Sequence, residues 1–80
     1  MVKWKRIENG LYQRFDDGQP QNVFIDRMGR MTESGKTLVV EGWMWAEQVD
    51  GKMESTGYWW QTLREAKTAL ETARGFDDVQ

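Results

Sequence analysis

Short runs of alternating apolar and polar residues fill the first sixty positions of the chain, and turn residues separate them. This period-two pattern is typical of β-strands with one buried face. One run, TLVVEGWMWAEQV, is apolar on both faces, which favours a central place in the sheet. The pattern predicts strands or strand-like segments over 3–7, 11–15, 23–28, 37–49 and 52–60.

Glycine-containing pairs mark two of the connections between these runs. Asn9-Gly10 and Asp50-Gly51 are hairpin signals, and Asp50-Gly51 is expected to form a type I′ turn. The segments 16–21 and 29–36 are expected to be loops, because they are polar and contain glycine or proline.

The Asp50-Gly51 turn also fixes the register of its hairpin. A two-residue turn sets Val49 opposite Lys52, and the pairs step outward from there. A glycine opposite a large side chain leaves room for a neighbouring ring to fold over the backbone. One face is expected to carry the pairs Trp45–Thr56, Trp43–Tyr58 and Glu41–Trp60, and the other Gln48–Met53, Ala46–Ser55, Met44–Gly57 and Gly42–Trp59.

The segment TLREAKTALETARG, near the end of the chain, has the spacing of an amphipathic helix. Thr62 and Glu65 form a capping-box signal at its start. Gly75 is expected to end the helix, with Phe76 folded back on the last turn. Residues 1–75 are predicted to form a single domain and 76–80 a C-terminal tail. The apolar stripe consists of Leu63, Ala66, Leu70 and Ala73, with Ala69 beside it.

Strands followed by one helix predict an α+β domain. We expect a twisted antiparallel sheet of four to five strands with one C-terminal helix packed on one face. The pattern leaves open whether Trp43 and Trp45 or Trp59 face the helix. It also leaves open how the other face is covered. The N-terminal strands could curl round as a partial barrel, using Trp4, Tyr12 and Phe15 or Phe24, or the face could stay open for a partner.

Four of the five tryptophans lie between positions 41 and 60. Aromatic residues in small domains are usually core, so we expect most of these rings to be buried and one or two to be exposed. An exposed group of rings on a small protein indicates a contact surface.

The composition excludes several kinds of chemistry. The chain has no cysteine and no histidine, which rules out disulfides, thiolate nucleophiles, Cys/His zinc sites and Ser-His dyads. Asp16-Asp17 and Asp77-Asp78 are expected to be solvated rather than catalytic. SGKT at 34–37 lacks the earlier glycine, the preceding strand and the following helix of a phosphate-binding loop. We therefore expect no enzyme activity, no cofactor and no metal site.

The charge balance and the apolar runs bear on partners and location. A net charge of −2 and a pI of about 5.0 argue against a general nucleic-acid binder. The chain starts without a signal-peptide pattern and has no run near the ~20 apolar residues that cross a membrane. We expect a soluble, cytoplasmic protein without membrane contact.

About a third of the chain, from Trp43 to Leu70, runs strand, tight turn, strand, aromatic residue and helix. The residues are WMWAEQ, VDGK and STGYWWQTLREAKTAL. This unit resembles the strand–strand–helix unit of the arm-binding domains of phage tyrosine integrases. It is similar also to plant ethylene-response-factor DNA-binding domains. Both families dock a three-stranded sheet in the DNA major groove. The helix-start motif is matched by Trp60, Thr62, Glu65 and Ala66.

The chain departs from those families on the sheet itself. Glu41, Glu47 and Glu54 stand on the hairpin, and the arginines and lysines that line the sheet in those families are not matched. The tryptophan-rich hairpin with its TLREAK helix also resembles small accessory proteins of phages and prophages.

These observations predict a non-enzymatic binding protein, a phage accessory factor that engages or inhibits a host protein through an aromatic and acidic sheet face. The alternative is a DNA-binding module of the integrase-arm type, and a third hypothesis is a homodimer that buries the open face. A protein partner is expected ahead of DNA. The predicted partner-binding residues are Trp43, Trp45, Glu47, Asp50, Glu54 and Tyr58, and the alternative DNA-binding residues are Lys3, Lys5, Arg6, Arg27 and Arg30.

Overall fold

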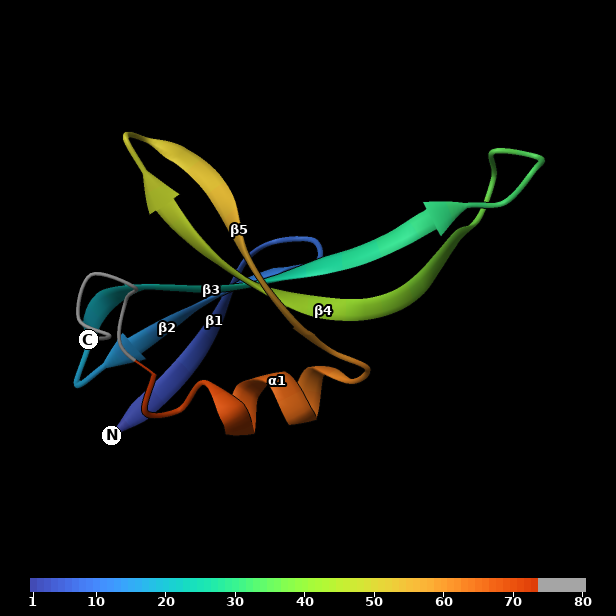
Figure 1. Ribbon diagram of the computed structural model, residues 1–80. Helices are drawn as coiled ribbons and strands as arrows, with labels where there is room; N and C mark the ends of the chain where they lie inside the picture. Colours follow the sequence, from blue (N-terminus) through green and yellow to red (C-terminus); the bar gives the residue numbers. More distant parts are fainter. Residues whose placement is uncertain (74–80) are drawn as a thin grey trace.

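Five antiparallel strands in sequence order and one C-terminal helix make up the protein, in a computed structural model that describes residues 1–73 (Figure 1). Each strand pairs with the next, which makes the sheet an open meander with β1 and β5 at its edges. This confirms the α+β class, the antiparallel sheet and the C-terminal helix. The elements are β1 (Val2–Glu8), β2 (Leu11–Asp16), β3 (Gln19–Met31), β4 (Leu38–Val49), β5 (Lys52–Trp60) and α1 (Leu63–Ala69).

Two hairpins have tight Asp-Gly turns. Asp50 and Gly51 have φ angles of 51° and 79°, so the expected pair of left-handed residues is present. Asp17 and Gly18 have φ angles of 51° and 82° and connect β2 to β3 in the same way. The loop predicted over 16–21 is therefore wrong beyond this turn, because the two residues already reverse the chain and β3 begins at Gln19.

The helix begins where the sequence predicts and ends earlier. The Thr62 hydroxyl accepts a hydrogen bond from the Glu65 backbone N–H at 3.1 Å and donates one to the Glu65 carboxylate at 2.9 Å. The helix ends at Ala69 with Leu70 as its C-cap, and Ala69 is exposed. The predictions for Gly75, Phe76 and the tail at 76–80 lie outside the described residues.

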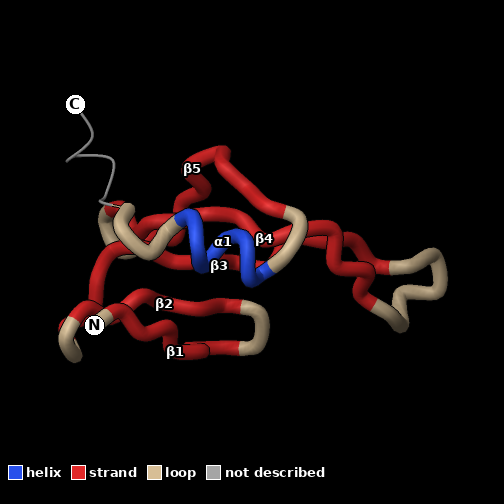
Figure 2. Tube along the Cα trace, turned by 90° about the horizontal axis from the view of Figure 1, so that it is seen from below, coloured by secondary structure: helices blue, strands red, loops and turns tan. Residues whose placement is uncertain are grey.

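A small buried cluster joins the helix to the sheet. Trp45 is 8% exposed, and this places the Trp43 and Trp45 side of β4 towards the helix, which answers the question that the sequence left open. Figure 2 shows α1 lying over the middle strands, with the β1–β2 hairpin alongside. The cluster consists of Val23, Ile25, Trp45, Ala66 and Leu70, with Trp4, Tyr12, Trp43, Trp60, Leu63 and Ala73 packed around it.

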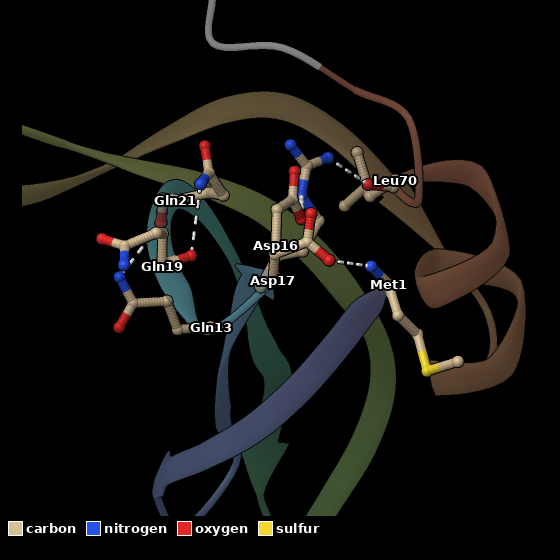
Figure 3. A network of polar contacts seen from close by, with 8 residues as sticks. Met1, Gln13, Asp16, Asp17, Gln19, Gln21 and Leu70 are labelled. Carbon is tan, nitrogen blue, oxygen red and sulfur yellow. Dashed lines mark hydrogen bonds and ion pairs between the residues drawn. The ribbon is translucent and has the colours of Figure 1, made fainter.

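A buried arginine links the N-terminal hairpin to the end of the helix. Arg14 is 5% exposed, and its Nη1 donates a hydrogen bond to the Leu70 carbonyl at 2.7 Å. Its Nε lies 3.1 Å from Oδ1 of Asp16. Figure 3 shows this region, with the ion pair between the Met1 amino group and Asp17 close by. Because the guanidinium contacts both β2 and the helix cap, it fixes the helix against the first hairpin.

The sheet face away from the helix is only partly apolar. One row across the strands runs Lys5, Gln13, Phe24, Ala46, Ser55, and the next runs Glu8, Leu11, Asp26, Met44, Trp59. Phe24 and Ala46 are buried there, whereas Trp59 is exposed. Trp4 and Tyr12 pack on the helix side, so they do not cover this face as a partial barrel would require.

The end of β3 and the start of β4 extend beyond the rest of the sheet (Figure 1). The loop at 32–37 joins them and contains the SGKT residues. Gly35 has a φ angle of 71°, as a turn glycine does, and a strand follows it rather than a helix.

Candidate functional site

Two aromatic side chains at the end of β5 are exposed. Tyr58 is 57% exposed and Trp59 is 51% exposed. The residues are adjacent on an edge strand, so their side chains point to opposite faces of the sheet. Exposed rings at an edge are accessible to a partner, and Trp and Tyr are the residues that anchor interfaces most often.

A bulge in β5 places these rings. The predicted register holds from Val49–Lys52 to Ala46–Ser55, and then three residues of β5 face the single residue Trp45. Trp43 consequently pairs with Trp60, and Met44 with Trp59. The predicted pairs beyond Trp45 are wrong by two positions. An even shift keeps every side chain on its predicted face.

Hydroxyl groups within the bulge form hydrogen bonds with nearby backbone groups. The Thr56 hydroxyl donates to the Trp45 carbonyl at 2.9 Å, and the Ser55 hydroxyl accepts the Gly57 N–H at 3.1 Å. Gly57 has a φ angle of 92°, which a side chain would disfavour. The sequence Ser-Thr-Gly therefore supports an irregular backbone that a regular strand would not need.

Trp59 lies against a bare backbone position. An ideal Cβ on Gly42 would be 2.7 Å from Cε3 of Trp59, so the ring covers this glycine on the face away from the helix. The ring is held on one side by Gly42 and exposed on the other. Such a ring is already ordered before a partner arrives.

Tyr58 lies on the helix side and contacts the core. Its ring centroid is 5.9 Å from that of Trp45, with the planes at 34°. The contact orders the Tyr58 ring while leaving more than half of the side chain in solvent.

A concavity of about 450 Å³ lies at the turn of the β4–β5 hairpin, at the other end of β5 from these two rings. The Asn22 side chain fixes its wall to β3, because it donates to the Gln48 carbonyl at 3.1 Å and accepts the Gln48 N–H at 2.7 Å. Asp50 and Glu54 are exposed at its rim and form no ion pair within residues 1–73. The lining also includes Glu47, Val49, Ser55 and Thr56.

The structure divides the six predicted partner-binding residues into two groups. Asp50, Glu54 and Tyr58 are exposed at the hairpin. Trp45 and Glu47 are buried, and Trp43 is half-buried with its ring edge-on to Tyr12 at 6.0 Å. These three residues face the helix-covered side, where a partner cannot reach most of their surface.

Trp59 was not among the predicted site residues. The signal that could have found it is the glycine at position 42, because a ring laid on a bare backbone position from an edge strand keeps its other face in solvent. We name the exposed residues Asp50, Met53, Glu54, Tyr58 and Trp59 the hairpin surface.

The five predicted DNA-contacting cations do not lie on one face. Lys3 and Lys5 project from the face away from the helix, whereas Arg6 and Arg27 are on the rows of Tyr12 and Trp43, which face it. Arg30 lies on the extension of β3 and forms an ion pair with Glu41 at 2.9 Å. The structure therefore separates these residues rather than gathering them.

Two of the carboxylates have shifted pKa values, and the described acids form no metal-binding cluster. Within residues 1–73 there is no group of three Asp or Glu side chains that could hold a metal ion. Burial raises the pKa of Asp26, and a nearby Glu8 adds to this, whereas the backbone hydrogen bond and charge of Arg27 oppose it. The Met1 amino group lowers the pKa of the exposed Asp17.

Comparison of the chain with protein-family models, curated proteins and solved structures finds no match. The one helix within residues 1–73 is too short and too polar to cross a membrane.

Proposed function

We propose that the protein is a non-enzymatic binding protein whose hairpin surface docks on a basic surface of another protein. The observation that carries the proposal is that β5 presents two exposed, ordered rings at one end, Tyr58 and Trp59, and the acidic rim of the concavity at the other. The resemblance to phage accessory proteins favours a host protein as the partner, and the effect on that partner would be steric.

The Tyr58 and Trp59 rings are already held in place in the free protein, which favours binding through them. Trp59 rests on Gly42 and Tyr58 rests on Trp45, so neither ring loses much side-chain freedom when it is covered. Half of each ring is in solvent, and its burial supplies the hydrophobic part of the binding free energy.

Charge favours a basic partner. Asp50 and Glu54 are exposed at the turn end of the hairpin surface, and Lys52 is the single basic residue between Asp50 and Glu54. Lysine or arginine side chains of a partner fit the acidic concavity in size and sign. Complementary charge at the rim speeds association more than it tightens the complex.

The DNA-binding alternative draws less support from the arrangement of its residues. Phosphate contacts need cations along one surface, and Lys3 and Lys5 are on the other face from Arg6 and Arg27. Fluorescence anisotropy of labelled mixed-sequence duplex DNA at low and moderate salt tests this alternative. Tight binding that weakens steeply with salt would favour it over the protein-binding proposal.

Affinity capture from a bacterial lysate tests the protein-binding proposal. The immobilised proteins are the wild type, Trp59→Ser and Glu54→Lys, with Ile7→Ser and Glu33→Lys as matched controls. Ile7 is an exposed apolar residue of β1, and Glu33 is an exposed acid in the loop at 32–37, so each control makes the same chemical change elsewhere. We expect a protein retained by the wild type and both controls and lost from Trp59→Ser and Glu54→Lys.

The captured protein is then purified and titrated against each variant, with unfolding curves to show that the variants are folded. Equal affinity for the wild type and Trp59→Ser would reject the aromatic part of the proposal. Sedimentation of the free protein tests the homodimer hypothesis, since a dimer that buries Trp59 would dissociate in Trp59→Ser.

A further inference from the structure

The free edge of β1 lies at the opposite side of the sheet from the hairpin surface. β1 has β2 as its only strand neighbour within residues 1–73. The Asp17 N–H donates to the Met1 carbonyl at 3.2 Å, which sets the alternation of the ladder. Lys3 and Lys5 therefore direct their backbone groups towards β2. Val2, Trp4 and Arg6 direct theirs away from the sheet, where an added strand could pair with them.

A cleft runs beside this edge on the helix side. It has a volume of about 430 Å³, and Trp4 forms its wall on the strand. Figure 2 shows α1 alongside the β1–β2 hairpin. The helix contributes Leu63, Arg64, Lys67 and Thr68 to the lining, and Glu71 follows just after the helix. The Trp4 and Leu63 side chains give the cleft an apolar part that suits the apolar side chains of an added strand.

Positive charge surrounds the same edge. Lys3 and Lys5 are exposed on the face opposite the cleft, and Arg6 is exposed at the end of the strand. The Lys5 ammonium lies 4.4 Å from the Phe15 ring centroid, and Lys67 lies 4.9 Å from that of Tyr12, so both cations are held near the edge. Lysines on an edge strand keep out neutral and basic strands. An acidic strand is attracted instead.

We propose that the β1 edge binds an extended segment of another protein in which acidic and apolar residues alternate. Backbone hydrogen bonds to Val2, Trp4 and Arg6 would add the segment as a sixth strand. Its apolar side chains face the cleft at Trp4, and its acidic side chains face Lys3 and Lys5, because successive residues of a strand point to opposite faces.

A second copy of the chain fits this edge less well. A copy offers two edges, β1 and β5. Two β1 edges would bring lysines of like charge together, and the bulge at Thr56–Tyr58 interrupts the outward backbone groups of β5. A separate acidic segment has no such interruption.

The test is anisotropy of the labelled, end-capped peptide Glu-Leu-Glu-Val-Glu-Leu-Glu against the whole protein. The variant Lys3→Glu/Lys5→Glu should weaken binding by about tenfold or more and should bind the corresponding lysine peptide instead. The control Lys36→Glu/Lys52→Glu changes the net charge equally at exposed lysines elsewhere and should bind like the wild type. If both double variants lost the same affinity for the acidic peptide, the attraction would be non-specific and the proposal would be overturned.

Two further measurements separate strand addition from simple charge attraction. A peptide with N-methyl groups on alternate backbone amides, on the side that faces β1, should lose binding. Hydrogen exchange at the Trp4 and Arg6 amides should slow when the unmodified peptide is bound, whereas exchange at Lys3 and Lys5 should change little. The proposal would be overturned if the methylated peptide bound fully, or if exchange at Trp4 and Arg6 were unchanged. It would also be overturned, in favour of a second copy, if these amides became protected without peptide as the protein concentration rose.

Discussion

Arg14 in β2 donates a hydrogen bond to the carbonyl of Leu70 at the end of the helix, at 2.7 Å and across 56 positions of sequence. The guanidinium is buried, and Asp16 lies 3.1 Å from its Nε. The contact gives a short hydrogen bond to a carbonyl at the C-terminal end of the helix, which also accepts a longer one from the Ala73 N–H at 3.4 Å. It makes a charged residue part of the packing between the helix and the sheet.

Replacement of Arg14 tests this contact. We expect Arg14→Ala to lower the free energy of unfolding by about 3 kcal/mol, because it leaves the Leu70 carbonyl and the Asp16 carboxylate without their buried partner. Urea denaturation measures the change. Arg64→Ala is the control, because Arg64 is exposed on the helix, and it should cost less than about 0.5 kcal/mol. Equal effects of the two replacements would show that the Arg14 contact contributes nothing specific.

The core and surface tryptophans should differ in their effect on stability. Trp45→Ala removes a ring from the cluster under the helix and is expected to cost about 3–5 kcal/mol. Trp59→Ala removes a half-exposed ring and is expected to cost about 1 kcal/mol. Thermal or urea unfolding measures both. Similar losses would contradict the assignment of Trp45 to the core and Trp59 to the surface.

Gly42 should be required for the position of Trp59. A Cβ at residue 42 would lie 2.7 Å from Cε3 of Trp59 and 2.9 Å from the Trp60 carbonyl oxygen. We expect Gly42→Ala to cost about 1–3 kcal/mol and to move the ring further into solvent, which red-shifts its fluorescence.

A double-mutant cycle with Trp59→Ala separates the two clashes at Gly42. Without the ring, the alanine meets only the Trp60 carbonyl, so Gly42→Ala should cost less in the Trp59→Ala background. An additive cycle would show that the ring does not press on Gly42.

Asp26 gives the pH dependence of stability a predictable sign. Its pKa is raised in the folded protein, chiefly by burial, so the folded state binds a proton at a higher pH than the unfolded state does. The contribution of Asp26 to the free energy of unfolding therefore increases as pH falls through the raised pKa towards the ordinary value of 3.8.

The variant Asp26→Asn tests this sign. It should be more stable than the wild type near neutral pH, and the difference between them should shrink as the pH is lowered. Urea unfolding at several pH values measures it, with Asp50→Asn as the control at an exposed aspartate. A stability difference that stays constant with pH would contradict the role given to Asp26.

Signals between neighbouring residues were sufficient to predict one turn and the start of the helix. The positive φ angles at Asp50 and Gly51 follow from the preference of that pair for a type I′ turn. The hydrogen bonds between Thr62 and Glu65 follow from their three-residue spacing. Both depend on neighbouring residues alone. The Asp17-Gly18 turn carries the same signal, but the proline at position 20 suggested a longer loop.

Other features depended on contacts between distant parts of the chain. The bulge at Thr56–Tyr58 shifts the predicted pairing of β5 with β4 by two positions. The turn at residues 50 and 51 fixes only the pairs next to it, so it does not determine the pairing beyond the bulge. The exposed position of Trp59 in the candidate site follows from that shift together with the bare backbone at Gly42. The acidic residues of the site, Asp50 and Glu54, were identified from sequence because they belong to the turn and its first pairs.

The sequence by itself determined a set of antiparallel strands with one amphipathic helix at its end, because alternation, turn pairs and caps act over a few residues. Only the tertiary structure decided which face of the sheet the helix covers, and therefore which rings are core and which are surface. Both faces of β4 are apolar, so its pattern suits either choice. The choice rests on the contacts that Ala66 and Leu70 make with Val23, Ile25 and Trp45, and on Arg14 reaching the helix end from β2. Those residues are far apart in sequence and meet only when the chain is folded.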